Sequence, residues 1–149
     1  MKSFPSVGAF VDFLAVVTRG VAAAEHRGLD KAGALIEKEA KGMLGYEHEE
    51  WPDLAPSTVA RKEAKGQTGR WSATDPLVAT GELLASISHQ IEGRAVIIGT
   101  PDEIGIYQEM GTDRIPPRPF LSATAMQHGE AAANLLGREV ALTIAGKPA

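Results

Sequence analysis

The chain has 149 residues, of which 44% are hydrophobic and 23% are charged, and its formal net charge is -4. This composition is typical of one soluble globular domain. The absence of cysteine excludes disulfide bonds, thiolate zinc sites and thiol nucleophiles.

The most apolar run near the N-terminus, residues 13–18, lies between Asp12 and Arg19. A membrane-spanning helix needs roughly 18 apolar residues with few charges, so we expect no membrane span. Only Lys2 supplies a positive charge near the N-terminus. Asp12 interrupts the apolar stretch that follows Lys2 before any small-residue cleavage site occurs. No secretory signal is therefore expected, and the chain is expected to stay in the cytoplasm where it is made.

Charge is unevenly distributed along the chain. Residues 1–70 hold ten Lys/Arg and ten Asp/Glu, whereas residues 71–149 hold five and nine. An acidic cluster is followed closely by a basic run; the residues are Glu47, Glu49, Glu50 and Asp53, then Arg61, Lys62, Lys65 and Arg70. Two adjacent blocks of opposite charge indicate a complementary protein surface, and the alternative is two solvated loop faces. The isoelectric point near 5.6 argues against a dedicated nucleic-acid binder.

Residues 1–45 are predicted to be helical, because apolar residues recur at spacings of three and four; they include Phe10, Phe13, Leu14, Val17 and Val21. Ser6 is the expected N-cap. We expect a break at Gly20 or at residues 27–29, with a second helix that begins at Asp30 and ends at Gly45. Its inward residues would be Ala34, Leu35, Ala40 and Leu44.

The composition of residues 46–79 predicts a loop-rich connection. Pro56, Ser57 and Thr58 predict a cap just ahead of a short helix from Val59 to Lys65, which Gly66 ends. Residues 67–75 show no apolar periodicity and are predicted to be a flexible loop.

Residues 80–121 are predicted to hold a short helix after Thr80 and Gly81, then a hairpin. Residues 86–92 alternate, with Ile87, His89 and Ile91 on one side, and a turn at Gly93 leads into residues 95–99. The second strand holds consecutive β-branched residues, which predicts that both of its faces are covered by other elements. A helix over residues 102–110, closed by Gly111, is expected to pack Tyr107 inward.

The last two elements follow from proline content and composition. The prolines of residues 115–121 exclude a helix there and predict an extended edge strand. Residues 122–146 are predicted to form the C-terminal helix. The expected architecture is a single α+β domain over residues 1–149, with long N-terminal helices and a C-terminal helix packed on a small antiparallel sheet, and with extended loops. The Ala-rich, aromatic-poor core also leads us to expect an oligomer.

No catalytic pattern is evident. The glycines do not form a phosphate-binding loop, no serine lies in a nucleophile elbow, and His26, His48, His89 and His128 are widely separated. We therefore expect no enzyme, no cofactor and no metal site. The enzymatic alternative is a small hydrolase that uses His48 with Glu47 or Glu49.

Several strings occur in a distinctive order: Trp51-Pro52-Asp53-Leu54-Ala55, Thr80-Gly81-Glu82-Leu83-Leu84-Ala85-Ser86-Ile87, Tyr107-Gln108-Glu109-Met110-Gly111-Thr112 and Ile115-Pro116-Pro117-Arg118-Pro119-Phe120-Leu121. Over residues 30–126 this series resembles the tail-completion, or virion-morphogenesis, family of long-tailed bacteriophages. No catalytic residue follows from the resemblance.

The resemblance implies a structural protein at the head-tail junction of the virion, present in the host cytoplasm during assembly. It implies a homo-oligomeric ring of six copies that joins head-closure or adaptor proteins to tail-terminator or tail-tube proteins. The candidate interface residues are Glu47, Glu49, Glu50, Trp51, Arg61, Lys62, Lys65, Arg70, Arg118 and Phe120. The alternative function is a nucleic-acid-contacting module that lines a DNA channel with its basic run.

Two of these residues have open roles at this stage. The stiff proline-rich segment loses little entropy on docking, so Arg118 can reach a partner's carboxylate or carbonyl while Phe120 anchors in a pocket. The alternative is that Phe120 and Leu121 seal the domain's own core.

Overall fold

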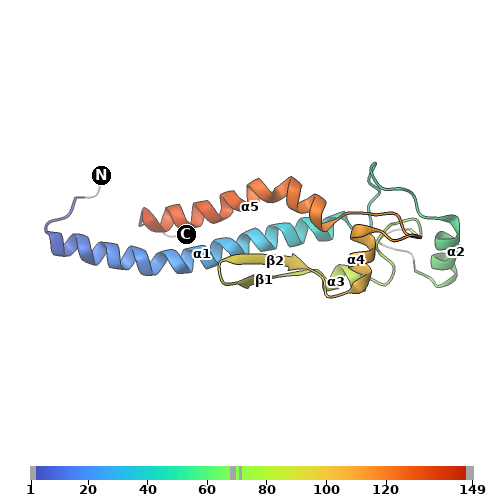
Figure 1. Ribbon diagram of the computed structural model, residues 1–149, viewed down its shortest axis with the longest axis horizontal. Coiled ribbons are helices and arrows are strands. Elements are labelled where there is room, and N and C mark those ends of the chain that lie inside the picture. The colour runs from blue at the N-terminus through green and yellow to red at the C-terminus, as the bar shows by residue number, and fades with distance from the viewer. Residues whose placement is uncertain (1–2, 68–69, 71, 147–149) are drawn as a thin grey trace.

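The computed structural model describes residues 3–67, 70 and 72–146 and has the predicted α+β fold. Figure 1 shows two long antiparallel helices side by side, a hairpin against the first of them, and three short helices gathered at the end away from the N-terminus. In chain order the elements are α1 (Val7–Met43), α2 (Pro56–Ala64), α3 (Glu82–Ser86), β1 (Ser88–Glu92), β2 (Ala95–Gly99), α4 (Glu103–Met110) and α5 (Leu121–Ile144).

Helix α1 is a single helix of 37 residues, about 55 Å long at 1.5 Å per residue. Ser6 caps it as expected, because its hydroxyl accepts a hydrogen bond from the Ala9 amide at 3.1 Å. The predicted break at Gly20 or residues 27–29 is wrong, and Asp30 lies inside the helix rather than at an N-cap. Helix α5 packs on one face of α1 and the hairpin packs on another. These tertiary contacts, which are made at glycines of α1, stabilise the continuous helix.

Glycines let α5 and the hairpin approach the α1 backbone closely. A Cβ added at Gly28 would lie 2.7 Å from Leu136 Cδ1 and 2.8 Å from Leu136 Cα. At Gly33, an added Cβ would lie 2.5 Å from the His89 ring and 2.7 Å from Val96. These glycines, which resemble helix breakers in sequence, therefore serve as contact points.

The α1–α5 contact has an apolar part and a charged part. Ala32, Ile36 and Ala132 form its buried cluster. Beside it the carboxylate of Glu139, itself buried, pairs with Lys31 and with Arg27 at 3.3 Å. The hydrogen bond from Lys31, with support from Arg27, lowers the pKa of Glu139, so the carboxylate stays charged in this contact.

The inward residues predicted for this part of α1 are partly correct. Ala40 and Leu44 are buried and Leu35 is half-buried, but Ala34 is exposed. Ile36, which the sequence analysis did not assign, takes the inward position.

Strands β1 and β2 form the predicted antiparallel hairpin, with His89 opposite Ile98 and Ile91 opposite Val96. These four side chains share the face that α1 covers. The prediction that the second strand is covered on both faces is wrong, because Ile97 points away from α1 and is 45% exposed. One helix against one face of a two-stranded sheet leaves the other face open to solvent.

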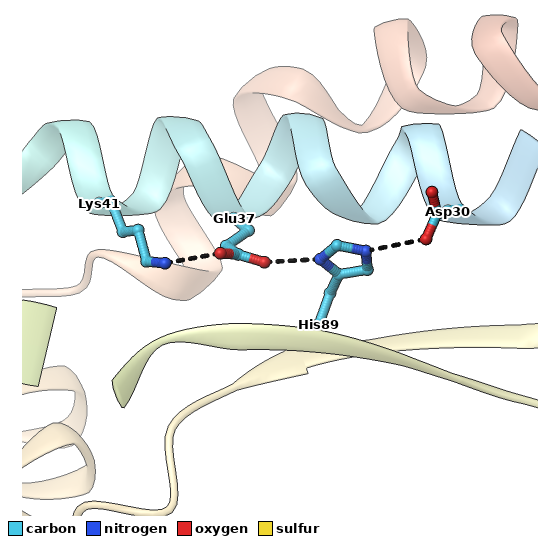
Figure 2. Close-up of polar contacts among 4 residues, drawn as sticks. All are labelled: Asp30, Glu37, Lys41 and His89. Atoms are coloured by element: carbon cyan, nitrogen blue, oxygen red, sulfur yellow. Dashed lines mark hydrogen bonds and ion pairs between the residues drawn. The ribbon is translucent and has the colours of Figure 1, made fainter. Parts of the chain in front are cut away.

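A polar bridge joins the hairpin to α1 (Figure 2). The His89 ring lies between two carboxylates of α1, with Nδ1 at 2.6 Å from Glu37 and Nε2 at 3.4 Å from Asp30, and Lys41 donates to Glu37 at 2.6 Å. The hydrogen bond with Glu37 raises the pKa of His89, against an opposing effect of burial. Lys41 and then His89 lower the pKa of Glu37.

The apolar core of the far end connects α1 with the short helices. Its buried residues are Ala40, Leu44, Trp51, Val78, Leu83, Ile87 and Phe120. Helix α2 begins at Pro56 with Ala55 at its N-cap, so the predicted cap at residues 56–58 ahead of Val59 is wrong. Helix α4 ends at Met110, and Gly111 (φ 74°) closes it as predicted. Tyr107 is exposed, so its predicted inward packing is wrong.

The predicted edge strand over residues 115–121 is also wrong. No strand forms there among the described residues, because the three prolines lead directly into α5, which begins at Leu121. Residues 68, 69 and 71 of the predicted loop over residues 67–75 lie outside the described residues.

Helix α1 passes the length and hydropathy test for a membrane-crossing helix, with an apolar window near the N-terminus of which only 6% is buried. Asp12 and Arg19 do not exclude α1 from the helices that could cross a membrane by length and composition. The sequence prediction of no membrane span therefore stays a prediction.

We expect Gly28→Ala to lower the free energy of unfolding by about 1–3 kcal/mol, because the new methyl group overlaps the Leu136 backbone. Gly42→Ala in the same helix is the control, since nothing lies within 4 Å of its added Cβ. It should gain up to about 1 kcal/mol from helix propensity. Urea unfolding of both variants checks the pair, and equal effects would contradict the close-contact role of Gly28.

The polar bridge should make stability depend on pH. Because folding raises the pKa of His89, its contribution is complete below the ordinary histidine value of about 6.5 and is lost as the pH rises through the raised value. Glu37 has a lowered pKa, so its contribution to the free energy of unfolding is lost only as the pH falls through that lowered value. From pH 5.5 to 8.5 the wild type should lose about 1 kcal/mol more than His89→Gln. His26→Gln, on an exposed position of α1, is the control in the same urea titrations.

Candidate functional site

Four segments that are far apart in the sequence meet at the α2 end of the molecule. They line a groove of about 450 Å³ between α2, residues 75–83, α4 and residues 114–118. Lining residues include Arg61, Lys62, Thr80, Leu83, Gln108 and Arg118. Segments separated by more than 60 residues therefore form one surface. We call it the end groove.

Arg118 forms part of the groove wall and is only 4% exposed. Its Nη2 donates to the carbonyl oxygens of Pro52 at 2.7 Å and Asp53 at 3.2 Å. Its backbone amide donates to the Gln108 carbonyl at 2.7 Å. Burial lowers the pKa of the Arg118 guanidinium, whose hydrogen-bond acceptors here are neutral carbonyls. The guanidinium of Arg118 thus binds carbonyl oxygens of its own chain, and the predicted contact with a partner's carboxylate or carbonyl is not seen.

Two buried polar atoms of the groove have no hydrogen-bond partner within the described residues. They are Arg118 Nε, a donor, and Gln108 Oε1, an acceptor. An unpaired buried polar group costs about 1–3 kcal/mol. Both atoms are enclosed beneath the surface of residues that line the groove.

Lys62 is not the exposed interface residue that its position in the basic run suggested. Its side chain is buried, and Nζ donates to the carbonyl oxygen of Asp75 at 2.7 Å. Burial lowers the pKa of Lys62, while the charge of Asp75 acts in the opposite direction. The ammonium group thus fixes residues 75–78 against α2.

Trp51 and Phe120 also lie inside the molecule. Both belong to the core of the far end, and the Trp51 ring packs against His48 with centroids 4.2 Å apart. The alternative in which Phe120 seals the domain's own core is correct, and a role for either ring at an interface is wrong. Large aromatic surfaces supply the burial that an Ala-rich core lacks.

The remaining interface candidates are exposed. Glu47, Glu49 and Glu50 lie on the loop before α2, and Arg61 and Lys65 lie on or just after α2. Within the described ranges, no ion pair joins Glu47, Glu49 or Glu50 to Arg61 or Lys65. Arg70 is exposed too, with its guanidinium 5.2 Å from the centroid of the Tyr46 ring.

Glu109 has a structural role that the sequence analysis missed. Its carboxylate accepts hydrogen bonds from the amides of Phe120 at 2.8 Å, Leu121 at 2.9 Å and Ser122 at 2.9 Å, and from the Ser122 hydroxyl. Burial favours a raised pKa for Glu109, but the hydrogen bonds from Ser122, Leu121 and Phe120 outweigh it and lower the pKa. Glu109 therefore caps α5 from another helix.

The geometry gives no support to the hydrolase alternative. His48 Nε2 lies 3.1 Å from the Met43 carbonyl, and no hydrogen bond links the ring to Glu47 or Glu49 in the described part of the chain. Over the same residues, no group of three or more His, Asp and Glu side chains is placed to hold a metal ion.

Comparisons of the chain with protein-family models, with curated proteins and with solved structures give no match. The end groove and its exposed charges therefore carry the functional argument, together with the resemblance of the strings that form them.

We expect Glu109→Gln to lower the free energy of unfolding by about 1–2 kcal/mol, since a neutral amide caps the α5 amides less well than a carboxylate. The control is Glu130→Gln, at an exposed position on α5. Because folding lowers the pKa of Glu109, the wild-type advantage should hold near pH 7 and shrink as the pH falls below about 4. Urea midpoints at pH 7 and pH 3 measure it, and an advantage that persists in acid would contradict the charge-based cap.

Proposed function

We propose that this protein is a structural subunit that assembles into a ring at the head-tail junction of a long-tailed bacteriophage. The observation that carries the proposal is the end groove, whose wall is built from the strings of the phage-family resemblance. Among the described residues, no group of His, Asp and Glu side chains is placed to hold a metal ion.

The end groove suits an extended segment of a neighbouring subunit. The groove wall is preorganised, because Arg118 and Lys62 are already held by backbone carbonyls.

The exposed charges orient neighbouring copies relative to each other. Glu47, Glu49 and Glu50 on one copy face Arg61 and Lys65 on the next, so one patch meets a different patch. Such heterologous contacts close into a ring when the rotation between copies is a simple fraction of a turn. Six copies, head-closure or adaptor proteins on one side and tail proteins on the other remain part of the proposal, as the family resemblance implies.

Charge reversal tests the ring contact. We expect Arg61→Glu with Lys65→Glu to weaken self-assembly at least tenfold at low salt, because both side chains are exposed and would repel the acidic loop. Lys62 is left unchanged because it is buried. Lys38→Glu, at an exposed position on α1, is the matched control. Adding Glu49→Lys and Glu50→Lys to the reversed chain should restore assembly, measured by mass in solution with and without phage heads or tails.

A wild-type chain that stays unassembled in every mixture would contradict the proposal, and so would reversed charges without effect. If the reversal instead abolishes a steeply salt-dependent binding of duplex DNA and leaves assembly intact, the DNA-channel alternative replaces the ring contact.

A further inference from the structure

The β1–β2 hairpin is fastened at its base, at its tip and along its middle, and these attachments differ in strength. At the base, the hydroxyls of Ser86 and Thr100 form a hydrogen bond of 2.5 Å between the two chain ends of the hairpin. At the tip, Arg94 pairs with Glu25, but the Arg94 side chain is 86% exposed. Exposed ion pairs contribute little to stability. Between a closed base and a weak tip, the attachment of the hairpin to α1 depends on its middle.

The middle of the hairpin lies directly on the backbone of α1. A Cβ added at Gly33 would lie 2.5 Å from the His89 ring and 2.7 Å from Val96. Both strands pack on α1, and the opposite face of the sheet is open to solvent at Ile97. A two-stranded hairpin is marginally stable at best by itself in water. The ladder between β1 and β2 therefore depends on the contact with α1.

The imidazole ring of His89 bridges two carboxylates of α1 (Figure 2). Nδ1 lies 2.6 Å from Glu37 Oε2, and Nε2 lies 3.4 Å from Asp30 Oδ1. An ionised carboxylate only accepts hydrogen bonds, so each contact needs an N–H group on the ring. The imidazolium is the one form of the ring that carries an N–H on both nitrogens. The geometry of the bridge is therefore that of a charged ring.

A neutral His89 ring cannot satisfy both carboxylates. The shorter contact, with Glu37, keeps the proton on Nδ1, because the hydrogen bond at one ring nitrogen sets the tautomer. Lys41 donates to Glu37 at 2.6 Å and helps to keep that carboxylate ionised. Nε2 of the neutral ring then presents a lone pair to Asp30, so that two acceptors face each other. Asp30 thus converts the loss of one proton into the loss of one attachment.

Strand β2 adds no charge to the surroundings of the ring. Residues 95–99 include no charged side chain, and Ile98 is the residue opposite His89. On β1 itself, Glu92 is three positions from His89 and lies on the other face of the strand. The hydrogen bond with Glu37 raises the pKa of His89, so the charged ring persists above the ordinary histidine value of about 6.5.

We propose that His89 and Asp30 form a proton-operated latch, which holds the hairpin on α1 while both ring nitrogens are protonated and loosens it when Nε2 loses its proton. The hairpin pivots on its closed base, and the exposed pair at the tip gives way. This local opening leaves α1, α5 and the core of the far end folded, so it differs from unfolding of the whole chain. It uncovers Val96 and Ile98 together with the α1 surface beneath them.

Amide hydrogen exchange of the full chain at pH 6 and pH 9 tests the latch. Protection factors, which correct for the intrinsic pH dependence of exchange, should fall about fivefold for β1 and β2 amides between the two pH values, because a hydrogen bond to a charged group is lost. Those of amides in the middle of α5 should not change. Hairpin amides with equal protection at both pH values would overturn the proposal. An equal fall in the hairpin and in α5 would show unfolding of the whole chain and would overturn it as well.

Asp30→Asn separates the latch from a purely structural contact. The Asn amide donates to a neutral Nε2 and its carbonyl accepts from a protonated one, so the hairpin should be equally protected at both pH values. The Asp30 side chain is 63% exposed, so the variant is expected to fold. Asp12→Asn, at an exposed position near the start of α1, is the matched control and should keep the wild-type response. A response of Asp30→Asn that equals that of Asp12→Asn would overturn the role of Asp30.

The ¹⁵N chemical shifts of the His89 ring report the protonation of each nitrogen separately. At pH 6 both nitrogens should be protonated, and at pH 9 the proton should remain on Nδ1 alone. His26, at an exposed position on α1, supplies the reference for a histidine outside the bridge. A neutral His89 ring with its proton on Nε2 would contradict the hydrogen bond to Glu37 as the anchor and would overturn the proposed mechanism.

The latch is independent of the proposed ring function, because its residues lie on the hairpin and on the middle of α1. Asp30→Asn should leave self-assembly unchanged. Reversal of Arg61 and Lys65, which lie on or just after α2, should leave the protection of the hairpin amides unchanged. Failure of one proposal is therefore distinguishable from failure of the other.

Discussion

The close approach of two different elements to one helix is the constraint on which this structure depends. Helix α1 accepts α5 at Gly28 and the hairpin at Gly33, and at neither place is there room for a methyl group. Small residues allow short interaxial distances, so an Ala-rich sequence can gain dispersion energy that its small side chains do not otherwise provide. The long helix, the antiparallel partner and the docked hairpin all follow from these two contacts.

Charged groups stabilise the contacts between these elements where little apolar surface is buried. Glu139 holds α5 to α1, His89 links the hairpin to Glu37, and Glu109 caps α5 from α4. Each group is partly or wholly shielded and has partners, which offsets its desolvation. Arg118 belongs to the same pattern, except that its Nε is left unpaired in the end groove.

The sequence predicts the elements of this fold better than their environments. Periodicity, capping residues and the Gly93 turn identify the helices and the hairpin, because these signals are local. The break in α1 was mispredicted because an intrinsic weakness of glycine in helices is reversed by tertiary contacts. The charged blocks were identified correctly, yet pattern alone cannot tell that Lys62 turns inward to Asp75 while Arg61, one residue earlier, stays in water. Glu109 was missed because its partners are eleven and more residues away.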